Sequence, residues 1–185
     1  EAASVDAFLI LRNELVLHDA PKRLVASAGR AARDEVRHAR MTSSMARRHG
    51  AMPKPVPASA GRTDRTLEEI AIENAIEGCV RETYGAVTAM WQASKAEDPR
   101  VRALMKRIAV DETRHAELAW SVAKWAHGRL SEESRARVDE AMRSAVHALA
   151  KEVSPPGVEL TRSAGLPSVA EARSLLGGMR DVLWS

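Results

Sequence analysis

The 185-residue sequence contains one cysteine, Cys79, and no long uninterrupted run of apolar residues. A single cysteine excludes an internal disulfide and any zinc or iron centre that needs several cysteines of this chain. We expect Cys79 to be a small buried apolar residue. No stretch approaches the roughly 18 apolar residues of a transmembrane helix, so we predict no membrane span.

Charge of one sign is not concentrated anywhere. The formal net charge is +3 and the isoelectric point is near 9.4, but Lys and Arg are spread among Asp and Glu. A nucleic-acid partner is therefore not indicated. The sequence begins at Glu1 without a methionine, so removal of a leader or an upstream segment is an open alternative. Localisation stays open, with the cytoplasm favoured.

Apolar residues make up 45% of the chain and recur at helical spacing, which predicts an all-α fold. Proline, glycine and capping residues place the expected helix ends. The predicted helices cover residues 4–18, 21–48, 66–95, 98–127, 131–153 and 168–183. The proline-rich stretch 50–65 cannot be helical, and it is long enough to cross the length of a bundle.

Two short-looped helical hairpins joined by one long crossover are the arrangement of a ferritin-like four-helix bundle. We predict one domain over residues 1–185, because this length suffices for a single core. The bundle core is expected within residues 1–128, and residues 131–185 are expected to form two additional C-terminal helices.

The motif Asp-Glu-x-Arg-His-Ala occurs twice, at residues 34–39 and 111–116. Residues three apart lie on one face of a helix, so Glu35 with His38, and Glu112 with His115, can each reach one metal ion. The contexts also agree, since each motif follows a helix-opening proline and each helix ends in His-Gly. The alternative is a pair of surface ion pairs, in which Glu and His point outward.

Two metal ions held by only two glutamates and two histidines would be under-coordinated, so each partner helix should supply a carboxylate. In an antiparallel hairpin, the partner lies about as far before the turn as the motif lies after it. This geometry selects Glu82 in the third helix, with Glu77 as the alternative. In the first helix it selects Glu1, with Asp6 as the alternative, while Glu14 lies too near the turn.

Asp34 and Asp111 precede the motif glutamates, and each can accept the second ring N–H of the opposite motif's histidine. Arg37 and Arg114 would then pair with these aspartates. The alternative is that all four are solvent-facing ion pairs. Tyr84, two residues after Glu82, is a candidate redox neighbour.

With these motifs, residues 1–128 resemble the ferritin-like di-iron carboxylate superfamily, which includes ferritins, rubrerythrins, ribonucleotide reductase subunits, monooxygenase hydroxylases and a tRNA hydroxylase. The resemblance implies that Glu35, His38, Glu112 and His115 form the paired motif and that Glu1 and Glu82 occupy the single-glutamate positions. Residues 1–8 and 77–83 also resemble small bacterial ferritin-like domain proteins that carry Glu-x-x-Ser-Val-x-x-Phe and Glu-Gly-Cys-Val-x-Glu-Thr.

The Asp-Glu-x-Arg-His form of the motif is more similar to the oxygen-activating members of this superfamily than to iron-storage ferritins. This resemblance implies an O2-dependent di-iron oxidase or oxygenase. The same ligands also serve a ferroxidase or a rubrerythrin-like peroxidase, and a non-catalytic metal-binding bundle is a third alternative. A tRNA-modifying hydroxylase is a special case of the first.

The resemblance favours two iron ions, although carboxylates and imidazoles also suit manganese, a mixed Mn/Fe pair or zinc. The expected partners are O2 or peroxide, a small-molecule substrate and an external electron donor, since the chain has no four-cysteine domain. A homodimer is compatible with the fold.

Overall fold

The computed structural model describes residues 2–53 and 64–184, and no strand occurs among them. The chain divides into two compact units, Glu1–Ile70 and Ala71–Ser185, each with its own internal packing. None of the described helices combines the length and the hydrophobicity needed to cross a membrane. The predicted all-α class is confirmed, whereas the ferritin-like bundle and the single domain stay predictions.

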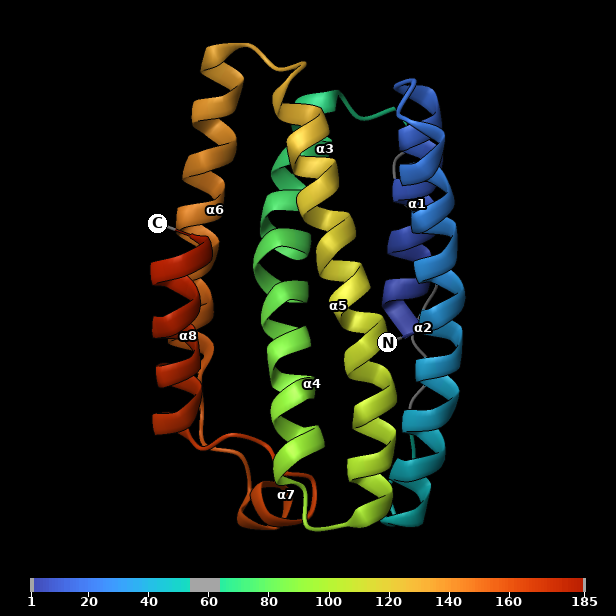
Figure 1. The fold of residues 1–185 in the computed structure, drawn as a ribbon, viewed down its shortest axis with the longest axis vertical. Coiled ribbons are helices and arrows are strands. Elements are labelled where there is room, and N and C mark those ends of the chain that lie inside the picture. Colours follow the sequence, from blue (N-terminus) through green and yellow to red (C-terminus); the bar gives the residue numbers. More distant parts are fainter. Residues whose placement is uncertain (1, 54–63, 185) are drawn as a thin grey trace. The chain divides into compact units, whose positions relative to one another are not determined.

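The first unit is a helical hairpin of α1 (Ala2–Leu17) and α2 (Lys22–Arg48), which pack side by side (Figure 1). Its turn is tight because Asp19 adopts a left-handed conformation, with φ of 53°, and the Ala20 N–H donates to the Leu15 carbonyl at 2.8 Å. The α1 residues Phe8 and Leu15 and the α2 residues Leu24 and Ala28 are buried. The hairpin therefore forms where the apolar repeat and Pro21 predicted it.

A buried carboxylate ties the end of the crossover to this hairpin. Glu14 of α1 is only 1% exposed and accepts two hydrogen bonds from the Arg65 guanidinium, at 2.5 and 2.8 Å. His18 Nε2 lies 3.0 Å from the carbonyl oxygen of Arg65. A carboxylate this deeply buried is tolerated because the bidentate Arg65 contact compensates for its lost hydration.

The second unit is built on a second helical hairpin. Its first arm runs without a break through α3 (Leu67–Glu73), η1 (Asn74–Glu82) and α4 (Thr83–Lys95), and the boundary between the two units falls inside α3. The other arm is α5 (Pro99–His127), which packs along η1 and α4. Capping agrees with the sequence prediction: the Thr66 and Glu69 capping box is present, and Asp98 accepts from the Arg100 N–H.

The middle of the first arm is a nine-residue π-helix, η1, which the sequence did not predict. Gly78 lies in it, and a Cβ there would come 2.6 Å from the Ala119 Cβ of α5. Asn74 is buried and donates to the Ala119 carbonyl at 3.0 Å. Close approach to α5 therefore requires glycine at 78, and the wider turn carries Asn74 and Gly78 onto α5 together. Such π-segments are often found at functional sites.

Three helices follow α5 in the described chain, and the first and the last of them pack on η1 through their own apolar residues. They are α6 (Glu132–Glu152), α7 (Val158–Ser163) and α8 (Val169–Leu183), of which the short α7 was not predicted. Val80 of η1, Ala145 and Leu149 of α6 and Leu176 of α8 form one buried cluster. The α7–α8 turn is held close to Ala96 by Gly165, whose φ is 67°. α6 and α8 therefore belong to the core of the second unit, whereas α7 has no buried residue.

Candidate metal centre

In the first unit, the motif of α2 brings a carboxylate and an imidazole together in a buried position. Glu35 and His38 are 2% and 0% exposed, and Glu35 Oε1 lies 3.2 Å from His38 Nδ1. The two residues are three apart on α2, so they share one face of the helix, as the spacing predicted. Neither side chain points outward, which contradicts the alternative of two solvent-facing ion pairs for this motif.

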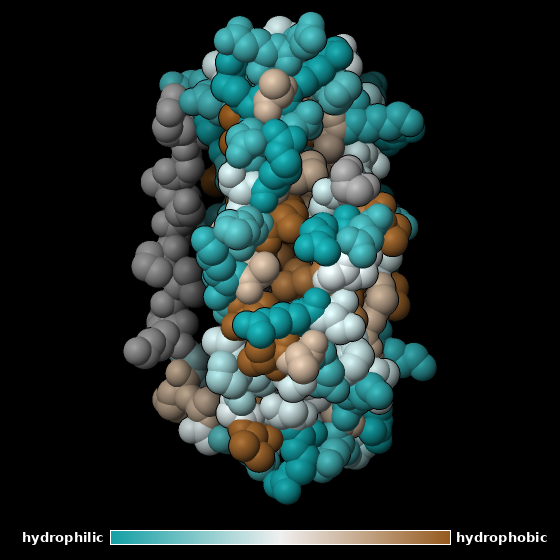
Figure 2. All heavy atoms as spheres, turned by 90° about the vertical axis from the view of Figure 1, so that its left-hand side faces the viewer, coloured by the Kyte–Doolittle hydropathy of each residue, from teal (hydrophilic) through white to brown (hydrophobic). Residues whose placement is uncertain are grey.

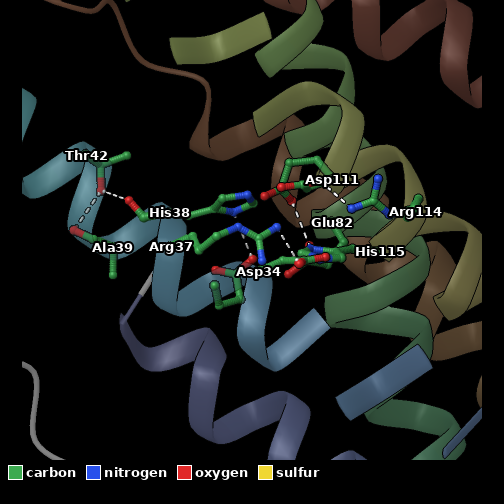
Figure 3. Close-up of polar contacts among 11 residues, drawn as sticks. Asp34, Arg37, His38, Ala39, Thr42, Glu82, Asp111, Arg114 and His115 are labelled. Atoms are coloured by element: carbon green, nitrogen blue, oxygen red, sulfur yellow. Dashed lines mark hydrogen bonds and ion pairs between the residues drawn. The ribbon is translucent and has the colours of Figure 1, made fainter. Parts of the chain in front are cut away.

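In the second unit, His115 of α5 lies next to two glutamates from different elements. Its Nδ1 is 3.6 Å from Glu112 Oε2, on the same helix, and 3.9 Å from Glu82 Oε2, at the end of η1. Figure 3 shows Glu82 directed at His115. The His115 side chain is 2% exposed, and those of Glu112 and Glu82 are 12% and 24% exposed. The hairpin therefore brings candidate ligands from both of its arms together.

The aspartate that precedes each motif glutamate is bound by the arginine three residues later. Arg37 donates to Asp34 at 2.6 Å, and Arg114 donates to Asp111 (Figure 3). Asp34 is 3% exposed, whereas Arg37 extends into solvent. Both predicted arginine–aspartate pairs are therefore present, and each motif builds the same local structure in its own unit. Contact of either aspartate with the opposite histidine stays a prediction.

Within each unit, the spacing of the carboxylate and imidazole atoms suits binding to one metal ion. Carboxylate oxygens and imidazole nitrogens bind such ions at about 2.0–2.2 Å, so two donors on one ion lie roughly 3–3.5 Å apart. The observed separations of 3.2, 3.6 and 3.9 Å are at or slightly above this range. A divalent cation would also offset the several kcal/mol that burial of an ionised carboxylate costs. The residues present therefore fit a metal with oxygen and nitrogen ligands.

Two glutamates and a histidine from two arms of one hairpin, and a Glu-x-x-His pair in the other unit, are the donor types of a carboxylate-bridged metal centre. No family model, curated protein or solved structure matches this chain. The likeness to di-iron proteins therefore rests on the motifs and on the geometry that each motif adopts.

The structure distinguishes between the two carboxylates predicted as alternatives in the third helix. Glu82 faces His115, whereas the alternative, Glu77, is exposed and pairs with Arg81 at 3.7 Å. The predicted ligand Glu1 lies outside the described residues, and its alternative, Asp6, is half-buried on α1. The choice of Glu82 over Glu77 therefore has structural support, and the choice between Glu1 and Asp6 stays a prediction.

Two buried polar residues beside this ligand group were missed by the sequence prediction. Thr83 follows Glu82 directly and accepts a hydrogen bond from Trp120 Nε1 at 3.2 Å. Asn74, at the start of η1, holds the π-segment to α5 through the Ala119 carbonyl. Nothing in their spacing marks them, because their burial depends on η1. These contacts hold η1 and α5 at the level of Glu82 and His115.

Tyr84 occupies a different environment from the ligand group. Its ring packs against the cluster of Val80, Ala145, Leu149 and Leu176, where α6 and α8 meet η1. Burial raises the pKa of the Tyr84 phenol. The ring therefore forms part of the packing of the C-terminal helices.

Cys79 is fully buried, and burial raises the pKa of its thiol from 9.0 to about 12. Because the thiolate is the reactive form, we expect the native protein to react with a thiol reagent at pH 8 at least about 100-fold more slowly than the unfolded chain. The measurement is the rate of modification in buffer and in denaturant. Equal rates would show that Cys79 is accessible.

The raised pKa of Cys79 also makes stability depend on pH. Between pH 9.0 and about 12 the thiol loses its proton in the unfolded chain but keeps it in the folded protein, so the free energy of unfolding falls as pH rises through that window.

Proposed function

We propose that the protein is a dinuclear non-haem metal protein, with two iron ions, that activates O2 as an oxidase or oxygenase. The observation that supports this is the repetition, in each unit, of a Glu-x-x-His pair with a buried histidine, accompanied by an arginine-bound aspartate. Surface ion pairs have no reason to bury the histidine in both copies, whereas metal ligands do. The proposed ligands are Glu35, His38, Glu82, Glu112 and His115, with Glu1 as the sixth.

The residues of the chain have distinct tasks in this proposal. Two iron ions held by these residues would supply the redox chemistry towards O2, and full reduction of O2 to water would take its remaining two electrons from a substrate or an external donor. Glu35 and His38 are shielded from water, so competing hydrolysis and proton leakage are limited. Arg37 binds Asp34 and Arg114 binds Asp111, so each arginine would hold the aspartate of its motif in place. Any electrons that the substrate does not supply would come from an external donor, because a single cysteine cannot form a four-cysteine iron centre.

The test begins with protein freed of metal and loaded anaerobically with Fe(II). Wild-type protein is expected to bind two equivalents and to develop a new near-ultraviolet or visible absorption after mixing with O2. Binding of fewer than two ions, or binding of two without any reaction with O2, would overturn the oxygenase proposal. In the latter case a non-catalytic metal-binding role would remain.

The variant Glu35→Gln separates a shared centre from two isolated sites. Glu35 lies in the first unit, and the group of Glu82, Glu112 and His115 lies in the second. For one dinuclear centre, Glu35→Gln lowers the affinity for both ions and abolishes the O2 reaction. If one ion still binds with wild-type affinity, the two motifs are independent and the dinuclear proposal fails. Glu68→Gln, on the partly exposed first turn of α3, is the matched control.

A further inference from the structure

A groove runs between α6 and α8 on the surface of the second unit, apart from the proposed metal ligands. Its volume is about 410 Å³, and α6 and α8 supply its walls. Figure 2, which views the side of α6 and α8, shows apolar side chains in a strip between hydrophilic ones. The groove is large enough for a small organic ligand, since such sites commonly measure about 300–1,000 Å³.

All charged side chains that line the groove are basic. Arg143 and His147 lie one turn apart on α6, and Arg173 and Arg180 lie two turns apart on α8. No Asp or Glu is among the lining residues. Arg143 is paired with Glu140 at 2.8 Å and Arg180 with Asp181 at 3.3 Å, both at exposed positions where such pairs are weak. Among the described residues, Arg173 has no ion pair.

The floor of the groove is apolar and firmly held. It consists of Val146 and Ala150 of α6, Leu176 of α8 and the ring of Trp184. The Trp184 indole N–H donates to the Cys79 carbonyl at 3.0 Å, and Leu176 belongs to the buried cluster beneath. The floor is therefore preformed, and ligand binding carries little conformational-entropy cost for ordering these side chains.

We propose that this groove binds an organic carboxylate with an extended apolar chain. The chain would cover the floor of Val146, Leu176 and Trp184, and the carboxylate would bind the guanidinium groups of Arg173 and Arg180. The groove extends about 10 Å along α6 from Arg143 to Ala150, at 1.5 Å per residue. An inorganic anion would leave the floor exposed, and an uncharged chain would gain nothing from the arginines.

Decanoate is a suitable probe, and the isotope-labelled full chain is a suitable target. Its four tryptophans give separate indole N–H signals in a nitrogen–proton correlation spectrum, and the Trp184→Phe variant identifies the one from Trp184. Decanoate is expected to shift the Trp184 signal saturably and to leave those of Trp91 and Trp125 unchanged. The double variant Arg173→Gln, Arg180→Gln should bind decanoate at least about tenfold more weakly than wild type, because two charge-assisted contacts are lost.

Three controls complete the experiment. Arg33→Gln removes an exposed arginine of α2 in the other unit and should leave decanoate binding unchanged. Decanol and acetate each retain one half of the ligand's chemistry and should bind at least about tenfold more weakly. A Trp184 signal that does not move, an affinity unchanged in the double variant, or equal binding of decanol would each overturn the proposal. Apo protein serves throughout, so the result is independent of the metal site.

Discussion

Replacing His115 with alanine is expected to weaken Fe(II) binding by the protein at least about 100-fold. His115 is the one imidazole between Glu82 and Glu112, at 3.9 and 3.6 Å from their oxygens. Disturbing a residue that only orients a metal ligand costs about 10–100-fold in affinity, so removing a ligand itself should cost more. The measurement is an anaerobic titration with Fe(II), followed by counting bound metal after removal of the excess.

Matched variants on the same helix make this result specific. His127→Ala and Glu117→Gln change exposed residues of α5 and should keep wild-type affinity. Since His115 is buried, its loss can also destabilise α5, so Glu82→Gln provides a second, nearly isosteric test at a partly exposed position. Unchanged Fe(II) affinity in both His115→Ala and Glu82→Gln, with native circular dichroism, would exclude the second-unit ligand group.

Replacing Glu14 with alanine is expected to lower the free energy of unfolding by about 3 kcal/mol, because it leaves the partly buried Arg65 guanidinium without its bidentate partner. Glu14→Gln retains one acceptor and should cost about half as much. Urea denaturation followed by circular dichroism measures both. Asn13→Ala changes the exposed neighbour and should stay within about 0.5 kcal/mol of wild type. A similarly small change for Glu14→Ala would show that the pair does not contribute.

The same variant tests whether the chain is one cooperative domain. All four tryptophans lie in the second unit, whereas Glu14 lies in the first. If the units unfold together, as the single-domain prediction requires, fluorescence and circular dichroism shift by the same amount in Glu14→Ala. If only circular dichroism shifts, the first unit unfolds by itself.

Most of the helices could be predicted from the sequence because their signals are local. An apolar repeat needs only its own residues to define a helix, and a cap such as Thr66 or Asp98 needs only the next three. The pairing within each Glu-x-x-His motif follows from helix geometry in the same way. The short α7 was not predicted because its six residues are too few to show an apolar repeat.

What the sequence by itself determined is therefore the all-α class, most of the helix ends and the shared helix face of Glu and His within each motif. Tertiary structure decided which carboxylate joins His115: Gly78 and Asn74 hold η1 against α5, which turns Glu82 towards the imidazole and leaves Glu77 in solvent. It also decided that Glu14 is buried and Arg65 reaches it across 51 residues. The physical reason is the same in each case. Burial and long-range pairing depend on side chains from another helix or segment, and the spacing of residues within one helix does not specify those contacts.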